Sequence, residues 1–148
     1  MTVRRARAEE APLLRALVER AYAPWVPVVG RRPMPMDDDY GVRVAAGEAW
    51  VLEEAGALRG VLVLVNHADH LLLENVAVEP ARKGEGHGRA LLDFAEAEAR
   101  RRGFPEVRLY TNERMERNIA LYAARGYAET GREEGEGFRR VFMAKRVG

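Results

Sequence analysis

Apolar residues recur every three or four positions in three parts of the chain, the spacing of one helix face. These parts are residues 8–22, 88–102 and 115–125. Gly103 and Gly126 follow the second and third of them, where glycine commonly ends a helix. Asp37 can cap a shorter helix that reaches to about residue 46. We therefore expect four helices.

Short runs of apolar and β-branched residues predict strands between these helices. The expected strands are residues 2–6, 49–53, 61–65, 71–78, 107–111, 127–130 and 137–145. Residues 23–36 hold four prolines, which restrict their own φ and that of their neighbours, so an ordered loop is expected there. The order β-α-α-β-β-β-α-β-α-β-β predicts an α/β or α+β domain around a mixed sheet. The length of 148 residues predicts one domain over residues 1–148.

The expected strand at 71–78 is apolar except for two residues, Glu74 and Asn75. Such a run is typical of a buried central strand. A carboxylate or amide there must face water, a partner or a substrate, because burying it unpaired is costly. Both polar residues therefore need an explanation, and Glu74 is carried forward as a candidate for function.

A glycine-rich loop, KGEGHGR, joins this strand to the helix at 88–102. Its glycines allow a sharp turn and a close ligand approach, and the unpaired N–H groups at the helix start attract anions. Phosphate binding and a plain tight turn are both open interpretations. A Walker loop is excluded because no Ser or Thr follows Gly-Lys, and the Rossmann glycine spacing is absent.

Residues 76–92, VAVEPARKGEGHGRALL, resemble the acetyl-CoA motif of the GNAT N-acetyltransferase superfamily. The family pattern is Val-x-Pro shortly before (Gln/Arg)-x-x-Gly-x-(Gly/Ala), and Lys83 stands at the Gln/Arg place. Residues 118–127, NIALYAARGY, are similar to the second family motif, Leu-Tyr-x-x-x-Gly-(Phe/Tyr). The resemblance implies a GNAT-like α+β fold: a mixed, mostly antiparallel central sheet with a splayed strand pair and flanking helices.

The resemblance also implies acetyl-CoA as cofactor. In the family the strand before the loop carries a bulge and splays from its neighbour, and the pantetheine arm lies in the gap while the loop holds the pyrophosphate. The cofactor-binding residues implied here are Val76, Ala77, Val78, Lys83, Gly84, Glu85, Gly86, His87, Gly88, Arg89, Asn118 and Tyr122. Met115 stands where many members have a cofactor-contacting Asn, so Asn118, with Asn112 behind it, is the substitute candidate. A solvated helix residue is the alternative for Asn118.

The family transfers the acyl group by direct attack of an amine on the thioester. Tyr122, four residues before Gly126, stands where the family has its general acid. The alternative interpretation is that Tyr122 is an aromatic residue of the core. Glu74 is the candidate base, directly or through water, and a structural ion pair is its alternative. A backbone N–H near Val76 could stabilise the oxyanion. A minor candidate for proton relay is the turn with His67, Asp69 and His70.

The first helices and their connection cover the acceptor site in this family. The candidate substrate-binding residues there are Tyr22, Trp25, Met34 and Tyr40. Such an apolar segment could wall an acceptor pocket or form a homodimer interface. We expect a small-molecule or peptide amine as acceptor, of a kind that the sequence does not single out.

The composition of the chain excludes several further classes of protein function. Lys and Arg total 24 against 23 Asp and Glu, which gives no overall field for nucleic acid or an anionic membrane. The chain has no Cys, which excludes a disulfide scaffold, a Cys-ligated metal and a cysteine nucleophile; no metal site is expected. The N-terminus lacks an apolar signal region and no run approaches 18 apolar residues, so a cytoplasmic location is expected. The prediction is an N-acetyltransferase, with a non-catalytic acyl-CoA sensor or a nucleotide-binding regulator as alternatives.

Overall fold

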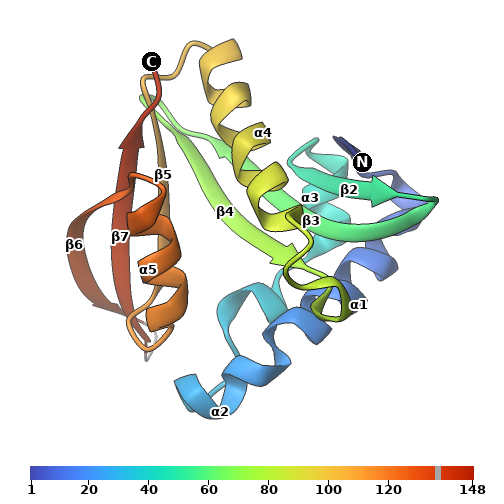
Figure 1. The fold of residues 1–148 in the computed structure, drawn as a ribbon, viewed down its shortest axis with the longest axis horizontal. Coiled ribbons are helices and arrows are strands. Elements are labelled where there is room, and N and C mark those ends of the chain that lie inside the picture. Colours follow the sequence, from blue (N-terminus) through green and yellow to red (C-terminus); the bar gives the residue numbers. More distant parts are fainter. Residues whose placement is uncertain (136–137) are drawn as a thin grey trace.

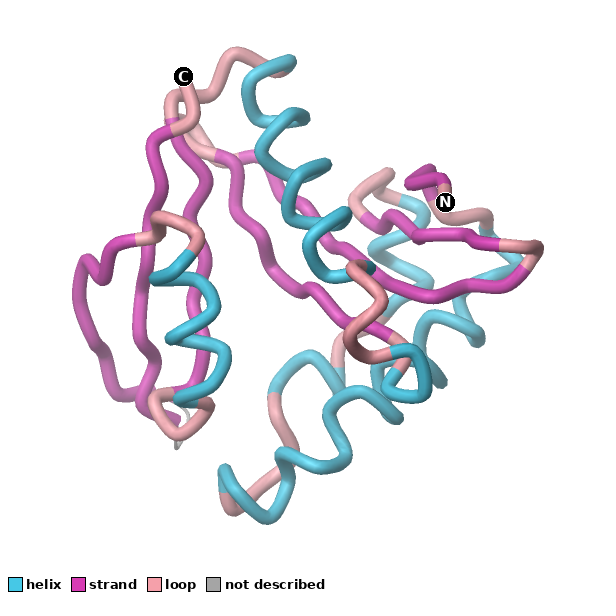
Figure 2. Tube along the Cα trace, viewed as in Figure 1, coloured by secondary structure: helices cyan, strands magenta, loops and turns pink. Residues whose placement is uncertain are grey.

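A computed structural model describes residues 1–135 and 138–148, and its strands form one mixed sheet (Figures 1 and 2). The strand order is β1-β2-β3-β4-β5-β7-β6. The strands are β1 (Thr2–Arg5), β2 (Ala49–Glu54), β3 (Ala57–Asn66), β4 (Leu71–Val78), β5 (Glu106–Asn112), β6 (Ala128–Gly135) and β7 (Phe138–Arg146). Among the strand pairs of the described residues, only β4 and β5 run in parallel. The predicted mixed, mostly antiparallel α+β architecture is confirmed.

Helices cover both faces of the sheet. The α-helices are α1 (Ala11–Tyr22), α2 (Val26–Val29), α3 (Tyr40–Ala45), α4 (His87–Arg101) and α5 (Glu116–Ala124). Helices α1 and α3 pack on one face, while α4 and α5 pack on the other. No helix in the described parts of the chain is long and apolar enough to cross a membrane.

Two apolar clusters hold these layers together, one on each face, because strand residues point alternately to the two sides. On β3, Leu62 and Leu64 join the cluster under α4, while Val61 and Val63 join the cluster under α1. On β4 this alternation shifts, since Leu73 packs under α4 but Ala77 packs under α1. Leu73 and Ala77 are an even number of positions apart and would lie on the same face of a regular strand. They lie on opposite faces because one residue is inserted between them.

That inserted residue is Glu74. In the β3–β4 register Leu64 pairs with Leu73 and the next residue, Val63, pairs with Asn75, which leaves Glu74 without a partner. A bulge of this kind re-aims a side chain and bends the strand. The bulge that the family resemblance implies therefore falls on the carboxylate singled out in the sequence.

Two expectations about the segment between α1 and β2 were wrong. Residues 23–36, expected to be a loop, contain short helical turns at Ala23–Trp25, Val26–Val29 and Met34–Asp37. Three of the prolines lie in the first positions of these turns, where a missing N–H costs no helical hydrogen bond, and Pro33 is the N-cap of the third turn. The cap of the next helix is Asp39 rather than Asp37, and its Oδ1 accepts from the Val42 N–H at 3.1 Å. In the expected strand at 137–145, Gly137 lies outside the described residues.

Candidate active site

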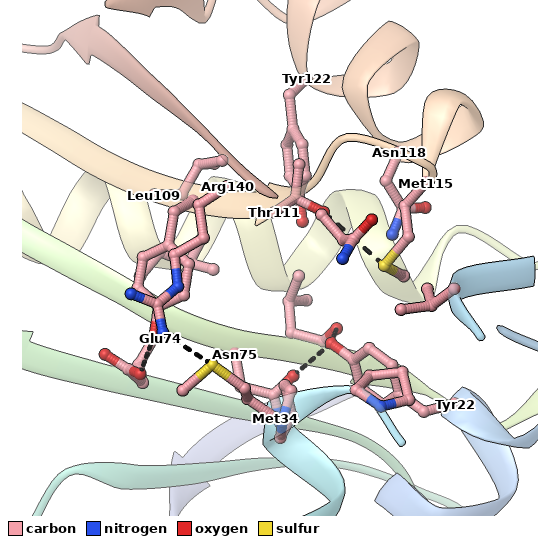
Figure 3. Close-up of a pocket in the computed structure, with 17 residues that line it drawn as sticks. Tyr22, Met34, Glu74, Asn75, Leu109, Thr111, Met115, Asn118, Tyr122 and Arg140 are labelled. Atoms are coloured by element: carbon pink, nitrogen blue, oxygen red, sulfur yellow. Dashed lines mark hydrogen bonds between the residues drawn. The ribbon is translucent and has the colours of Figure 1, made fainter. Parts of the chain in front are cut away.

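Strands β4 and β5 separate after three residue pairs, from Leu71–Val107 to Leu73–Leu109. Two hollows meet where they part. The first, here called the strand-end groove, runs between α1–α2 and α5 along the end of β4. The second, the inner pocket, lies deeper between the separated strands (Figure 3). The two hollows adjoin, since they share four lining residues: Tyr22, Val76, Asn118 and Tyr122.

The loop before α4 forms one end of the strand-end groove. Gly84 and Gly86 have φ of +89° and +85°, a conformation that side-chain-bearing residues rarely adopt. A Cβ at either glycine would meet no atom within 4 Å, so the outer side of the loop is open. Gly86 is the N-cap of α4, and the first N–H groups of that helix have no helical acceptor. This arrangement suits an anionic group.

The groove lining brings together seven of the twelve predicted cofactor residues. They are Val76, Ala77, Val78, Lys83, Gly88, Asn118 and Tyr122. The other five are not part of the lining: Gly84, Glu85 and Gly86 of the loop, and His87 and Arg89 of the first turn of α4. Two arginines that the sequence reasoning missed, Arg114 and Arg117, also line the groove, with Glu116 between them. They could not be found from the sequence because their place in the groove depends on how α5 packs.

In the inner pocket, Glu74 of β4 and Tyr110 of β5 bridge the separated strands. The Tyr110 hydroxyl donates to Glu74 Oε1 at 2.5 Å. Burial, together with this bond to a carboxylate, raises the pKa of Tyr110 above its ordinary value, so the hydroxyl stays protonated. The Arg140 guanidinium lies 5.3 Å from the centre of the Tyr110 ring. Tyr110 was not predicted, since its position in β5 carries no signal until β5 is placed opposite the bulge.

Asn75, the second polar residue of β4, is buried and fully engaged. Its Oδ1 accepts from the Tyr22 hydroxyl at 2.6 Å, and its Nδ2 donates to the Tyr40 hydroxyl at 3.1 Å. Tyr40 in turn donates to the Pro35 carbonyl at 2.6 Å. This chain of hydrogen bonds ties β4 to the segment between α1 and β2 and explains how Asn75 tolerates burial.

The four candidate acceptor residues separate in the structure. Tyr22 and Met34 line the inner pocket. Trp25 instead lines the strand-end groove, beside the predicted cofactor residues. Tyr40 lines neither hollow and is 3% exposed, so direct contact with an acceptor, as expected from the sequence, is not available to it; it acts on the pocket only through Asn75.

Tyr122 lies on α5 where the two hollows join. Its ring packs edge to face against the ring of Tyr127, with 5.8 Å between the ring centres. No described residue forms a hydrogen bond with its hydroxyl. Burial raises the pKa of Tyr122 to about 12, so it carries its proton at neutral pH. The relay candidates His67 and His70 line a different hollow, beside β5 and β6–β7.

Comparison with known proteins agrees with this geometry. Residues 14–127 match the family model described as the Acetyltransferase (GNAT) family, and the chain belongs to that family. A relative, N-acetyltransferase family 8 member 3 of Rattus norvegicus, is 33% identical over 88 residues, which are 55% of this chain but only 39% of the relative.

Solved structures share the fold. The PaiA N-acetyltransferase of Thermoplasma acidophilum in complex with coenzyme A has a TM-score of 0.82 at 15% identity, covering 98% of both chains. The ribosomal-protein-S18-alanine N-acetyltransferase of Escherichia coli has a TM-score of 0.77 at 20% identity, covering 99% of this chain and 93% of that one. The yncA structure of Salmonella typhimurium, a putative acetyltransferase with its cofactor acetyl-CoA, has a TM-score of 0.75 at 22% identity, covering 100% of this chain and 94% of that one.

Proposed function

We propose that this chain is an acetyl-CoA-dependent N-acetyltransferase that moves an acetyl group to a primary amine by direct attack. One observation carries the proposal: where β4 and β5 separate, Glu74 and Tyr122 line one continuous hollow from two different elements. A carboxylate and a protonated phenol on the same pocket are what the two proton transfers of this reaction require.

The residues present fit acetyl-CoA, which supplies an activated acyl group when bound. The backbone of Val76–Val78 would hold the pantetheine arm along the open side of β4. The N–H groups at the start of α4 would bind the diphosphate, and Lys83, from the same loop, would add positive charge there. The open outer side of Gly84 and Gly86 supports this assignment.

Glu74 acts as the base in this proposal. A free alkyl ammonium has a pKa of about 10 and must lose a proton before it can attack. Tyr110 occupies Oε1 of Glu74, which leaves Oε2 to accept that proton, directly or through water. Tyr110 is thus a positioning residue: it fixes the carboxylate between the strands.

Tyr122 completes the transfer by giving its proton to the leaving thiolate sulfur. The amine nitrogen would form the new C–N bond as the C–S bond breaks and would lose its second proton to water, and water would later return a proton to Tyr122. A thiol like that of CoA has a pKa of about 8.5, so protonation of its thiolate at neutral pH is favourable. A backbone N–H near Val76 would stabilise the charge on the carbonyl oxygen.

A turnover screen of acetyl-CoA with diverse small amines and peptide N-termini tests the proposal, read by thiol release and product mass. Glu74→Gln should lower kcat about a hundredfold or more, since it keeps shape but loses the base. Binding of acetyl-CoA, followed by thermal shift, should be unchanged in that variant. Cofactor binding without thiol release for any amine would contradict the enzyme and favour an acyl-CoA sensor.

A further inference from the structure

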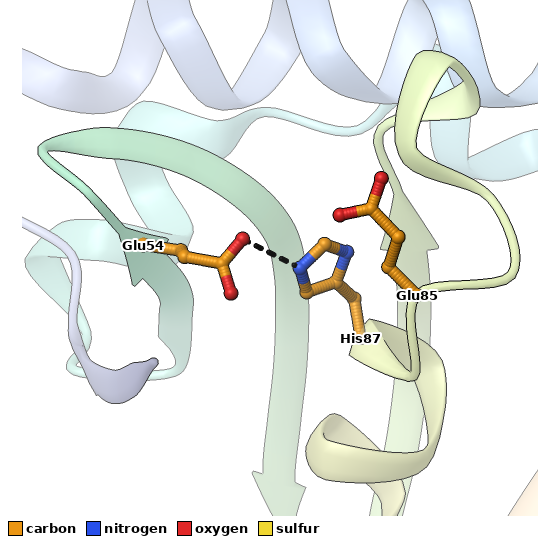
Figure 4. Close-up of side chains that lie close together, drawn as sticks. All are labelled: Glu54, Glu85 and His87. Atoms are coloured by element: carbon orange, nitrogen blue, oxygen red, sulfur yellow. Dashed lines mark hydrogen bonds and ion pairs between the residues drawn. The ribbon is translucent and has the colours of Figure 1, made fainter.

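Three side chains gather beneath the loop before α4, outside both hollows (Figure 4). Glu54 comes from the end of β2, Glu85 from the loop and His87 from the first turn of α4. One ligating atom of each lies within 4.8 Å of the other two. The His87 side chain is 0% exposed, whereas that of Glu85 is 44% exposed.

The hydrogen bonds of His87 leave one ring nitrogen unused. Its Nε2 lies 3.3 Å from Glu54 Oε1, and a carboxylate can only accept, so Nε2 carries a hydrogen. Nδ1 is buried and has no hydrogen-bond partner among the described residues. In Figure 4 the imidazole lies between the two carboxylates, with Glu85 on the side away from the bond to Glu54.

In a neutral imidazole this Nδ1 presents a lone pair, and it faces a carboxylate that also offers lone pairs. Two acceptors do not attract each other, so a positive group between them would satisfy both. The nearest cation to Glu85 is Arg82, at 3.7 Å, but that pair is on the surface and longer than a hydrogen bond, so it holds Glu85 weakly.

We propose that His87 Nδ1 and the Glu85 carboxylate bind a divalent transition-metal ion of the Zn²⁺ type, with Glu54 holding the opposite ring nitrogen. Imidazole nitrogen and carboxylate oxygen are common ligands of such ions. A carboxylate on the second nitrogen is the usual way in which a ligating histidine is oriented. Glu85 is exposed enough to give the ion entry and to leave positions for water.

The site has a consequence for the cofactor, which rests on the proposed function. Glu85 brings a negative charge into the loop that would bind the diphosphate. An ion between Glu85 and His87 neutralises this charge and should strengthen acetyl-CoA binding. Because the coupling of two binding sites is reciprocal, acetyl-CoA should strengthen metal binding by the same factor.

The test uses a His67→Ala/His70→Ala background. This removes two of the three histidines of the chain and leaves only His87. Zn²⁺ is titrated by calorimetry, and Co²⁺ is followed by its visible absorption. Imidazole ¹⁵N NMR reports on Nδ1 directly and needs no change at His87. We expect one Zn²⁺ per chain and a metal-dependent shift of the Nδ1 signal.

Two variants and a control locate the ligands. Glu85→Gln should weaken Zn²⁺ binding at least about tenfold, and Glu54→Gln about tenfold or more through the loss of orientation. Glu134→Gln, an exposed change on β6, should have no effect. An unshifted Nδ1 signal in Zn²⁺, a protonated Nδ1 at pH 7 that stays so in Zn²⁺, or unchanged Zn²⁺ binding in Glu85→Gln would each overturn the site.

The coupling is measured separately with acetyl-CoA, which has no free thiol to bind zinc. Zn²⁺ should lower the Kd of acetyl-CoA at least about fivefold in the background protein. In Glu85→Gln the Kd should already be low and should not respond to Zn²⁺. Equal affinity with and without Zn²⁺ would contradict the coupling. Failure of acetyl-CoA to bind under any condition would instead contradict the proposed function, while the metal titration alone still decides the site.

Discussion

The strand-end groove and the inner pocket share a wall but are built in different ways. One wall of the groove is a single stretch of chain, residues 76–88, which offers backbone groups from the end of β4 and the start of α4, while α1–α2 and α5 supply the opposite walls. The inner pocket is made by side chains from separate elements: Tyr22 of α1, Glu74 of β4, Tyr110 of β5 and Tyr122 of α5.

The difference bears on how each side would recognise its ligand. Backbone N–H groups and open glycines suit a constant group such as a diphosphate, since they depend on local conformation and little on side-chain identity. The inner pocket depends on the alignment of phenols, a carboxylate and an amide through hydrogen bonds. We therefore expect substitutions in the groove to change cofactor affinity and those in the inner pocket to change turnover or acceptor use.

The largest effect is expected at the junction of the two. Tyr122→Phe keeps the ring but removes the proton, and kcat should fall about 10²–10⁴-fold. Acetyl-CoA affinity and melting temperature should change little. Since the pKa of Tyr122 is about 12, the wild-type kcat should show no loss from its ionisation below about pH 11.

Tyr127→Phe is the matched control for this variant, because it removes a buried phenol hydroxyl that bonds to Glu96 and does not line either hollow. Its kcat should stay near that of the wild type. A Tyr122→Phe protein with nearly full kcat, measured where chemistry limits the rate, would remove Tyr122 from the mechanism and leave water as the proton source.

The next largest effect is expected from a substitution confined to the strand-end groove. Gly86→Val places a side chain on the open side of the loop and opposes the positive φ of that position. The Kd of acetyl-CoA should rise at least about tenfold, or about 1.4 kcal/mol. Calorimetric titration measures this directly.

Gly103→Val serves as control for backbone strain, since Gly103 also has a positive φ, of +81°, and open surroundings, but follows the other end of α4. It should lose stability without losing acetyl-CoA affinity. Equal affinities in Gly86→Val and the wild type would refute the assignment of the loop to the diphosphate.

Tyr110→Phe tests whether the inner pocket works by positioning. Loss of one hydrogen bond should lower kcat about threefold to tenfold, with acetyl-CoA affinity unchanged. The loss should fall on kcat and leave the KM of acetyl-CoA unchanged, because the carboxylate of Glu74 is then less firmly held for the amine. A merely structural role for Tyr110 would lower stability and leave kcat near that of the wild type.

The smallest effects on affinity and KM are expected at two residues that the sequence assigned to the same ligand. Trp25 and Met34 were both expected to contact the acceptor, yet they line different hollows. Trp25→Ala should raise the Kd of acetyl-CoA about threefold, through loss of an aromatic contact. Met34→Ala should raise the acceptor KM by a similar factor. Steady-state kinetics with both substrates varied distinguishes them, and the reverse pattern would restore Trp25 to the acceptor side.

Much of the groove could be predicted because its information is local. The glycines, the helix start and the strand before them follow one another within 20 residues, so spacing alone predicts their arrangement. Glu74 and Asn75 were conspicuous for a related reason: they interrupt an apolar strand. Which face each would occupy was not predictable, because the bulge at Glu74 appears only in the pairing of β4 with β3.

Other parts depended on contacts between distant segments. Tyr110 gains its role from a hydroxyl bond across 36 positions to Glu74, and Tyr40 loses its expected contact because Asn75, 35 positions away, covers it. His87 looked like one more loop residue until β2 brought Glu54 to its ring. The sequence by itself determined the order of elements, the glycine loop and the two family motifs, since these rest on short-range periodicity and backbone conformation. Only the tertiary structure decided which side chains meet, because hydrogen bonds and burial depend on strand register and helix packing.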